Sequence, residues 1–190
     1  VFACQARNKM ANGNLIDAVW VRRWKYEPKQ GRKIIKSRLC GRGFLDKQKF
    51  DIQRHSSTAS RLSQKLVVSV AQCHDDFELE SWDISTAFLQ GLTFEELRKR
   101  ARELKINCET VRKVFMMPPA NVWRHLDSIT NSGIHVKEID IPFFVLELLK
   151  PMYGLVDAPH LWQVALSLYL VNHLGARISL WDENFVYWTY

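Results

Sequence analysis

The chain has 190 residues, a mass of 22.3 kDa and a formal net charge of +7. This is the size of one domain, since domains usually contain about 100 to 200 residues. With 47% hydrophobic and 25% charged residues, the composition is that of a globular protein and excludes a disordered or collagen-like chain. The longest apolar stretch, residues 141–149, is interrupted by Glu147 and is much shorter than the ~20 residues that span a bilayer, so we expect no membrane interaction. Residues 1–10 contain neither a secretory signal nor an initiator Met, and we expect a piece of a longer protein.

The positive charge is concentrated at one end of the chain. Residues 1–50 carry 13 Lys and Arg against 3 Asp and Glu, whereas the other 140 residues carry a net −3. Polar and apolar residues alternate over 18–26 and 32–40, around a turn with Pro28 and Gly31. This pattern predicts a β-hairpin with its apolar residues on one face and Arg22, Lys36 and Arg38 near the other. Such a surface suits a polyanion, because Lys and Arg release counterions when they neutralise phosphates; a solvated basic face without a partner is the alternative.

The remaining elements alternate between helix and strand. Apolar spacing predicts a helix over 60–74 that Ser60 caps, and alternation over 77–84 predicts a strand that ends near Asp83. Thr93 and Glu96 form a capping box at the start of a helix that continues to about residue 105. The further predicted elements are a short helix over 121–129, a buried strand over 143–149, a helix over 159–174 that ends at Gly175, and a strand over 183–190. The fold class is therefore α+β, or mixed α/β.

The four cysteines are widely separated. Cys4, Cys40, Cys73 and Cys108 follow one another at intervals of 36, 33 and 35 residues, without the spacing of metal ligands. We interpret them as reduced thiols of a cytosolic or nuclear protein. A framework of two disulfides remains the alternative.

The segment WDISTAFLQG, residues 82–91, carries the sharpest chemical signal. A carboxylate at a strand end, followed by a turn of small residues and an aromatic residue, can hold a divalent cation above a pocket. A lone Asp at such a position is more often structural. The segment is accompanied, in chain order, by KSRLCGRGF (36–44), HSSTASRLS (55–63), VFMMPP (114–119) and LELLKPMYGLVDAPHLW (146–162). Together these segments, over residues 18–190, resemble the reverse transcriptase of copia-type long-terminal-repeat retrotransposons.

The resemblance implies a right-hand polymerase fold in a single partial domain. Residues 18–75 would form the fingers, residues 76–92 and 143–190 part of the palm, and residues 93–142 an insertion or connecting region. Reverse transcriptases carry two further aspartates in a Tyr-x-Asp-Asp hairpin, which this sequence lacks. Because two-metal nucleotidyl transfer needs several carboxylates, we expect the chain to be inactive as an RNA-directed DNA polymerase on its own.

The resemblance also implies roles for individual residues. Asp83 would be the first ligand of Mg²⁺ or Mn²⁺, with the main-chain carbonyl of Ile84 beside it. The residues that would bind a deoxynucleoside triphosphate are Lys36, Arg38, Phe88 and Tyr153, with Phe88 excluding a ribose 2′-hydroxyl. The residues that would contact nucleic acid are Arg22, Arg42, Gly154 and Pro159. The alternatives are a solvated strand face for Lys36 and Arg38, and core packing for Phe88.

Several positions depart from the family pattern. Val156, Asp157 and His160 stand where Lys, Gln and Arg are usual, so the basic contacts near the template are fewer. About twenty extra residues precede Val114, among them the basic helix that begins at Thr93. This helix could contact nucleic acid, although a solvated face is the simpler interpretation.

The expected partners are an RNA or DNA primer-template, deoxynucleoside triphosphates and the rest of a Pol polyprotein with its integrase and ribonuclease H. The expected location is the cytoplasm, in a virus-like particle, with access to the nucleus left open. One alternative function is a non-catalytic, nucleic-acid-binding retroelement remnant. A metal-dependent hydrolase is another, but the six histidines lack ligand spacing.

Overall fold

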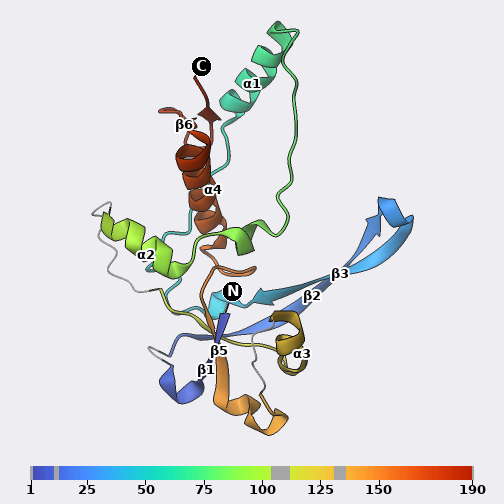
Figure 1. The fold of residues 1–190 in the computed structure, drawn as a ribbon, viewed down its shortest axis with the longest axis vertical. Helices are drawn as coiled ribbons and strands as arrows, with labels where there is room; N and C mark the ends of the chain where they lie inside the picture. Colours follow the sequence, from blue (N-terminus) through green and yellow to red (C-terminus); the bar gives the residue numbers. More distant parts are fainter. Residues whose placement is uncertain (1, 11–12, 104–111, 131–135, 190) are drawn as a thin grey trace.

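The structure is a computed structural model that describes residues 2–10, 13–103, 112–130 and 136–189. It is a mixed α+β fold around one five-stranded sheet, which confirms the predicted fold class at that level (Figure 1). All neighbouring strands are antiparallel except β2 and β4, which are parallel. In spatial order the strands of the sheet are β1 (Phe2–Ala6), β5 (Phe144–Leu148), β4 (Phe115–Met117), β2 (Leu15–Glu27) and β3 (Arg32–Gly41).

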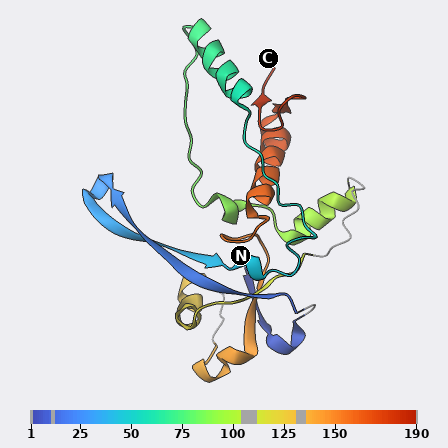
Figure 2. The ribbon, with the colours of Figure 1, turned by 180° about the vertical axis from the view of Figure 1, so that it is seen from behind.

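The described ranges also contain four α-helices and several short 3-10 helices. The α-helices are α1 (Arg61–Cys73), α2 (Phe94–Glu103), α3 (Ala120–Thr130) and α4 (Ala158–Leu174). The 3-10 turns are η1 (Arg7–Lys9), η2 (Pro28–Gln30), η3 (Gly43–Leu45), η4 (Ala87–Gln90) and η5 (Glu138–Phe143). A two-residue ladder joins β6 (Arg177–Ile178) to β7 (Val186–Tyr187). Helix α4 rises away from the sheet, with α1 beside its far end (Figures 1 and 2).

The capping signals in the sequence are confirmed. Ser63 N donates to Ser60 Oγ over 3.0 Å at the start of α1. At the start of α2, Glu96 N donates to Thr93 Oγ1 over 3.1 Å, and Thr93 N donates to Glu96 Oε2 over 2.7 Å. Gly175 ends α4 in the left-handed conformation, with φ of 67°. All four predicted helices are therefore present, and their described ends lie within a few residues of the predicted ones.

The hydrophobic core lies where the centre of the sheet meets α3 and the start of α4. Phe115, Met116 and Leu146 are almost completely buried in the two central strands. The inner half of β2 contributes Ile16 and Ala18 to the same core. Beyond Asp17, β2 no longer pairs with β4 and is bonded to β3 alone. The two strands therefore leave the sheet together as a projecting arm.

This projecting arm, residues 20–38, is the predicted hairpin, and it has two chemically different faces. Residues that face each other across an antiparallel ladder share a side of it, and side chains alternate along each strand. One side, the aromatic face, carries Trp20, Arg22, Trp24, Tyr26, Lys33, Ile35 and Ser37. The other side, the cationic face, carries Val21, Arg23, Lys25, Glu27, Arg32, Ile34, Lys36 and Arg38. The prediction was correct for Lys36 and Arg38 but wrong for Arg22, which pairs with Ser37 on the aromatic face.

The strand predicted over residues 77–84 is absent. This segment is extended but unpaired, and Phe77 and Leu79, which alternation would bury, are 52% and 56% exposed. The position beside β5 is instead filled by β1, and the position between β5 and β2 by β4. Neither β1 nor β4 was predicted as a strand. Of the strand predicted over 183–190, only Val186 and Tyr187 form a ladder among the described residues 183–189, whereas the strand predicted over 143–149 is β5.

Within the described residues, Cys4, Cys40 and Cys73 are free thiols, as predicted. Burial raises the pKa of the Cys4 thiol above its usual value. Cys108 and the end of the basic helix prediction near residue 105 lie outside the described residues. Among the helices of the described ranges, none is long and apolar enough to cross a membrane.

Candidate nucleotide site and basic arm

Two segments that are far apart in the chain meet at the base of the arm. Gly41, which ends β3, donates its amide to the Tyr153 carbonyl over 2.8 Å. A Cβ atom on Gly154 would lie 2.0 Å from the Gly41 carbonyl oxygen, and one on Gly43 would lie 2.2 Å from the Gly154 oxygen. Gly154 also has φ of 94°, a conformation that side chains rarely permit. The sequences KSRLCGRGF and KPMYGL are therefore joined by a backbone contact that requires glycine.

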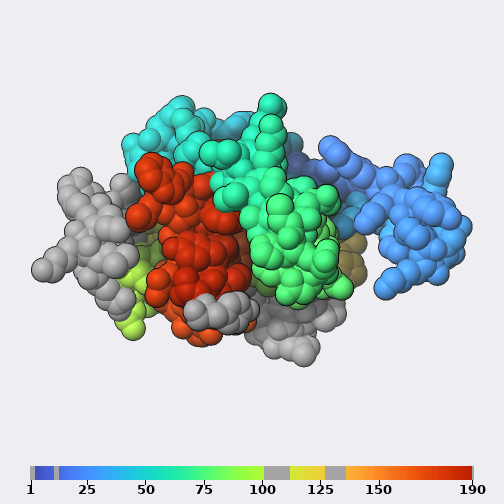
Figure 3. All heavy atoms as spheres, turned by 90° about the horizontal axis from the view of Figure 1, so that it is seen from above, coloured from blue at the N-terminus to red at the C-terminus, as the bar shows by residue number. Residues whose placement is uncertain are grey.

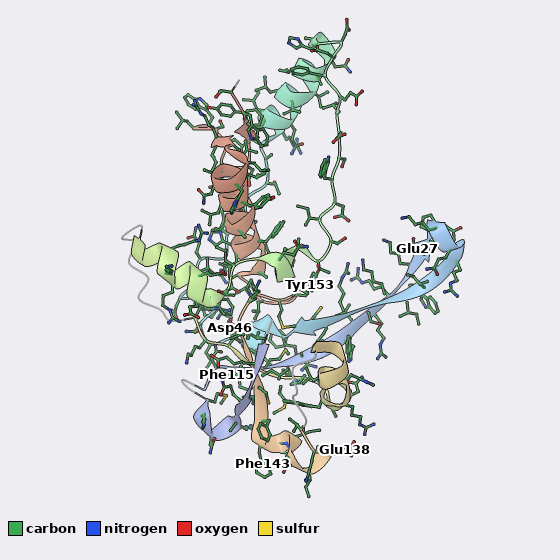
Figure 4. All side chains as sticks on the ribbon, viewed as in Figure 1. Glu27, Asp46, Phe115, Glu138, Phe143 and Tyr153 are labelled. Atoms are coloured by element: carbon green, nitrogen blue, oxygen red, sulfur yellow. The ribbon has the colours of Figure 1, made fainter. Side chains whose placement is uncertain are left out.

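Three of the predicted nucleotide-binding residues converge beside this contact. The Arg38 guanidinium carbon lies 5.7 Å from the centroid of the Tyr153 ring. The Phe88 and Tyr153 ring centroids are 5.4 Å apart, with an angle of 58° between the planes. Figure 4 shows Tyr153 near the inner end of the arm. Arg38 is exposed, whereas the two rings are half-buried. A cation over aromatic rings at the edge of solvent can bind an anionic group and stack a planar one.

Phe88 reaches this place because the preceding turn and η4 direct it there. Thr86 has φ of 53°, which is uncommon for a residue other than glycine. Leu89 N donates to the Thr86 carbonyl over 2.9 Å, and Gln90 Nε2 donates to the Ser85 carbonyl over 2.6 Å. Gly91 follows, and a Cβ atom at this position would lie 3.4 Å from Pro151 Cγ and 3.7 Å from the Leu161 carbonyl oxygen of α4. The turn thus holds η4 against the helix that follows Tyr153.

Asp83 and Ile84 lie in the exposed segment before this turn. Residues 80–83 line an open depression, in which Trp82 Nε1 donates to Glu80 Oε2 over 2.8 Å. The described ranges contain no group of three or more His, Cys, Asp or Glu side chains that could hold a metal ion. One carboxylate and one carbonyl do not fit a two-metal centre, in which several oxygens bridge ions about 4 Å apart. The residues present at Asp83 therefore do not fit such a centre by themselves.

The other predicted residues lie along the arm, at its base or at the start of α4. Lys36 is exposed on the cationic face, directly opposite Arg23. Arg42 forms an ion pair of 3.0 Å with Asp17 at the base of the arm. Gly154 serves the backbone contact described above, and Pro159 is a half-buried residue in the first turn of α4.

A buried ionic network next to this junction was missed by the sequence analysis. The Arg112 guanidinium lies 2.7 Å from Asp46 Oδ2 and donates to both carboxylate oxygens of Asp157 over 2.9 and 3.1 Å. Asn14 Nδ2 donates to Asp46 Oδ1 over 3.0 Å. Burial acts to raise the pKa of Asp46, but the hydrogen bonds and charge of Arg112, with help from Asn14, outweigh it and lower that pKa below 3.8. No local spacing could have revealed partners so far apart in sequence, although the acidic Asp157 in place of Gln was a hint.

The network gives Asp157 a structural role. Asp157 is buried at the start of α4, where it neutralises Arg112 from the segment before β4. Burial by itself would lower the pKa of Arg112. The hydrogen bonds and charges of Asp46 and Asp157 outweigh burial, so the pKa of Arg112 is raised. Asp157 therefore joins elements of the fold and does not reach outward.

No protein-family model matches the chain, and no solved structure is significantly similar to it.

Proposed function

We propose that this chain is the fingers and part of the palm of an RNA-directed DNA polymerase of the copia type. One observation supports it most: residues from three separate motifs, Arg38, Phe88 and Tyr153, meet at one place beside a glycine-dependent contact. The sequence resemblance assigns all three to the nucleotide.

In this proposal the three side chains divide the work of binding a deoxynucleoside triphosphate. Arg38 neutralises negative charge on the phosphates, which a guanidinium does with short charge-assisted hydrogen bonds. Tyr153 holds the guanidinium in place, and the Phe88 ring lies beneath the sugar, where its bulk excludes a ribose 2′-hydroxyl. Asp83 and the Ile84 carbonyl would contribute to holding Mg²⁺ or Mn²⁺ together with the triphosphate. Because Asp83 alone does not complete a two-metal site, we expect the 190-residue chain to bind nucleotide without extending a primer.

The assigned regions follow from the same proposal. Residues 18–75 would be fingers, residues 76–92 and 143–190 palm, and residues 93–142 a connecting region. The partners would be a primer-template, the rest of a Pol polyprotein with integrase and ribonuclease H, and the place of action a cytoplasmic virus-like particle.

Nucleotide binding by the purified chain tests the proposal. Titration with dTTP in the presence of Mg²⁺, followed by calorimetry, should give binding that Arg38→Ala weakens at least tenfold, because a phosphate ligand is lost. Affinity for a short duplex should change no more than about threefold. Arg32→Ala is the matched control, since Arg32 is an exposed arginine of the same strand and face. Phe88→Ala should reduce the preference for dTTP over UTP. Equal losses for nucleotide and duplex in Arg38→Ala would show a generic basic patch.

A second candidate function is a non-catalytic nucleic-acid-binding remnant of such an element. The arm favours it: none of its Lys and Arg side chains forms an ion pair with a carboxylate in the described part of the chain. Arg23 and Lys36 even face each other directly, an arrangement that is destabilising without an anion nearby. Asp83→Asn separates the two functions. Loss of Mg²⁺-dependent dTTP binding supports the polymerase fragment, whereas nucleic-acid binding without any dTTP binding supports the remnant.

A further inference from the structure

The aromatic face of the arm has a covered base and an uncovered end. At the base, Trp20 Nε1 donates to Asn121 Oδ1 of α3 over 3.2 Å. Farther out, Trp24, Tyr26 and Ile35 are 70%, 57% and 54% exposed. We call these three residues the platform. Trp24 and Ile35 pair directly across the ladder, and Tyr26 follows two residues along the same strand and face.

The platform is surrounded by positive charge. Residues 20–38 contain eight Lys and Arg and one Glu, a net +7. Arg22 and Lys33 share the face of the platform, and Figure 3 shows the tip of the arm as a lobe that stands clear of the rest of the molecule. An apolar protein partner that covered the platform would have to bury these cations at high cost. A ligand that offers both flat apolar surfaces and phosphates matches both features.

We propose that the platform stacks the unpaired bases of a single-stranded nucleic acid, whose phosphates pair with the surrounding Lys and Arg. Two residues along a strand span about 6.8 Å, which is twice the ~3.4 Å rise per stacked base. One base can therefore lie between Trp24 and the ring of Tyr26. Aromatic residues stack on bases of any sequence, because every base has a π-face. Bases in a duplex already stack on each other and do not offer these faces.

The platform is separate from the proposed nucleotide site. Arg38, which lies over Tyr153, belongs to the cationic face, so the platform lies on the opposite side of the arm. Single-strand binding at the platform consequently does not depend on polymerase chemistry, and it would hold for the non-catalytic alternative as well. A strand on the platform and a nucleotide at Arg38 can be bound at the same time.

Fluorescence anisotropy with a labelled oligothymidine of 12 residues tests the inference on the whole chain. Trp24→Ala should weaken binding about tenfold, and Trp24→Ala with Tyr26→Ala about a hundredfold. Trp24→Phe should retain most of the affinity, since it keeps an aromatic ring. Binding of a 12-base-pair duplex should change less than twofold in all three. Trp181→Ala is the matched control, because Trp181 is 96% exposed and lies outside the arm, in the segment between β6 and β7.

The outcomes separate the candidates. Losses confined to the single strand support stacking, and a parallel titration with oligouridine of the same length distinguishes a DNA-selective platform from one that takes either chemistry. Equal losses for strand and duplex, or no loss in the double variant, would overturn the inference. Binding of dTTP is tested with the Arg38 variant and single-strand binding with the platform variants. Either proposal can therefore fail without affecting the other. Thermal unfolding of each variant checks that these exposed substitutions leave the fold unchanged.

Discussion

At the scale of single residues, Gly154 carries a structural role that the resemblance had assigned to nucleic-acid contact. Gly154→Ala should lower the free energy of unfolding by about 3 kcal/mol, because the new Cβ would meet the Gly41 carbonyl in a left-handed backbone conformation. Urea unfolding measures the loss. Gly31→Ala is the matched control, since Gly31 has φ of 62° but nothing within 4 Å of its Cβ position. Equal losses for the two variants would show that backbone strain alone, without the close contact, sets the cost.

The ion network centred on Arg112 is the second residue-scale feature. Arg112→Met should destabilise the fold by about 3 to 5 kcal/mol, since it leaves two buried carboxylates without their cation. The exposed pair of Arg124 and Glu138, 2.6 Å apart, gives a control: Arg124→Met should cost no more than about 1 kcal/mol. Chemical denaturation at pH 7 compares them. A loss of stability in Arg112→Met as small as that in Arg124→Met would mean that water solvates the two carboxylates once the guanidinium is removed.

At the scale of elements, a single carboxylate ties α1 to the C-terminal ladder. Asp182 Oδ2 accepts from Ser63 Oγ and from Ser60 N, the latter over 2.7 Å, and Asp182 Oδ1 accepts from Asn184 N over 2.9 Å. These hydrogen bonds, with that of Ser63 the strongest, lower the pKa of Asp182 from 3.8 to about 2. The carboxylate thus joins the helix start to the segment between β6 and β7.

The direction of the Asp182 pKa shift determines how this contact responds to acid. Because the pKa is lowered in the folded state, the contact is fully present above about pH 3.8 and is lost as the pH falls through about 2. An NMR titration of the Asp182 carboxyl should therefore have its midpoint near 2. Asp182→Asn should speed hydrogen exchange of the first-turn amides of α1 already at pH 6, whereas Asp75→Asn, at the other end of α1, should not. An ordinary midpoint near 3.8 would contradict the contact.

Helices and strands whose signals lie within their own residues could be predicted from the sequence. Strands whose place depends on which distant segment pairs with the sheet could not. The hairpin, α1, α2 and α4 each carry alternation, a cap or a glycine stop within their own residues. Residues 77–84 alternate as well as any strand, yet β1 and β4 take the places beside β5, and the segment remains unpaired. The site divides in the same way. A shared place for Arg38, Phe88 and Tyr153 was implied by the resemblance, whereas the Arg112 network depends on three distant segments meeting.

At the scale of the whole molecule, the positive charge is separated from the packed core and lies mostly on the arm. The sheet, α3 and the start of α4 form the packed part, while the arm extends with Glu27 near its tip (Figure 4). Most of the +10 net charge of residues 1–50 lies on the arm, and the rest of the chain is weakly acidic. The long-range field of the molecule therefore directs a polyanion to the arm first.

This arrangement predicts where the salt dependence of nucleic-acid binding originates. Each phosphate that a cation neutralises on a single strand contributes about −0.7 to the slope of log K against log salt concentration. Arg22→Ala with Lys33→Ala, both on the face of the platform, should therefore make the slope shallower by about 1.4. Lys137→Ala, an exposed lysine just before η5, should leave it unchanged, because η5 lies below the sheet in Figure 1, well away from the tip of the arm. Anisotropy titrations between 50 and 300 mM salt measure all three slopes. Stacking contributes affinity that does not depend on salt, so it cannot compensate for a loss of counterion release. An unchanged slope in the double variant would therefore mean that the phosphates bind elsewhere.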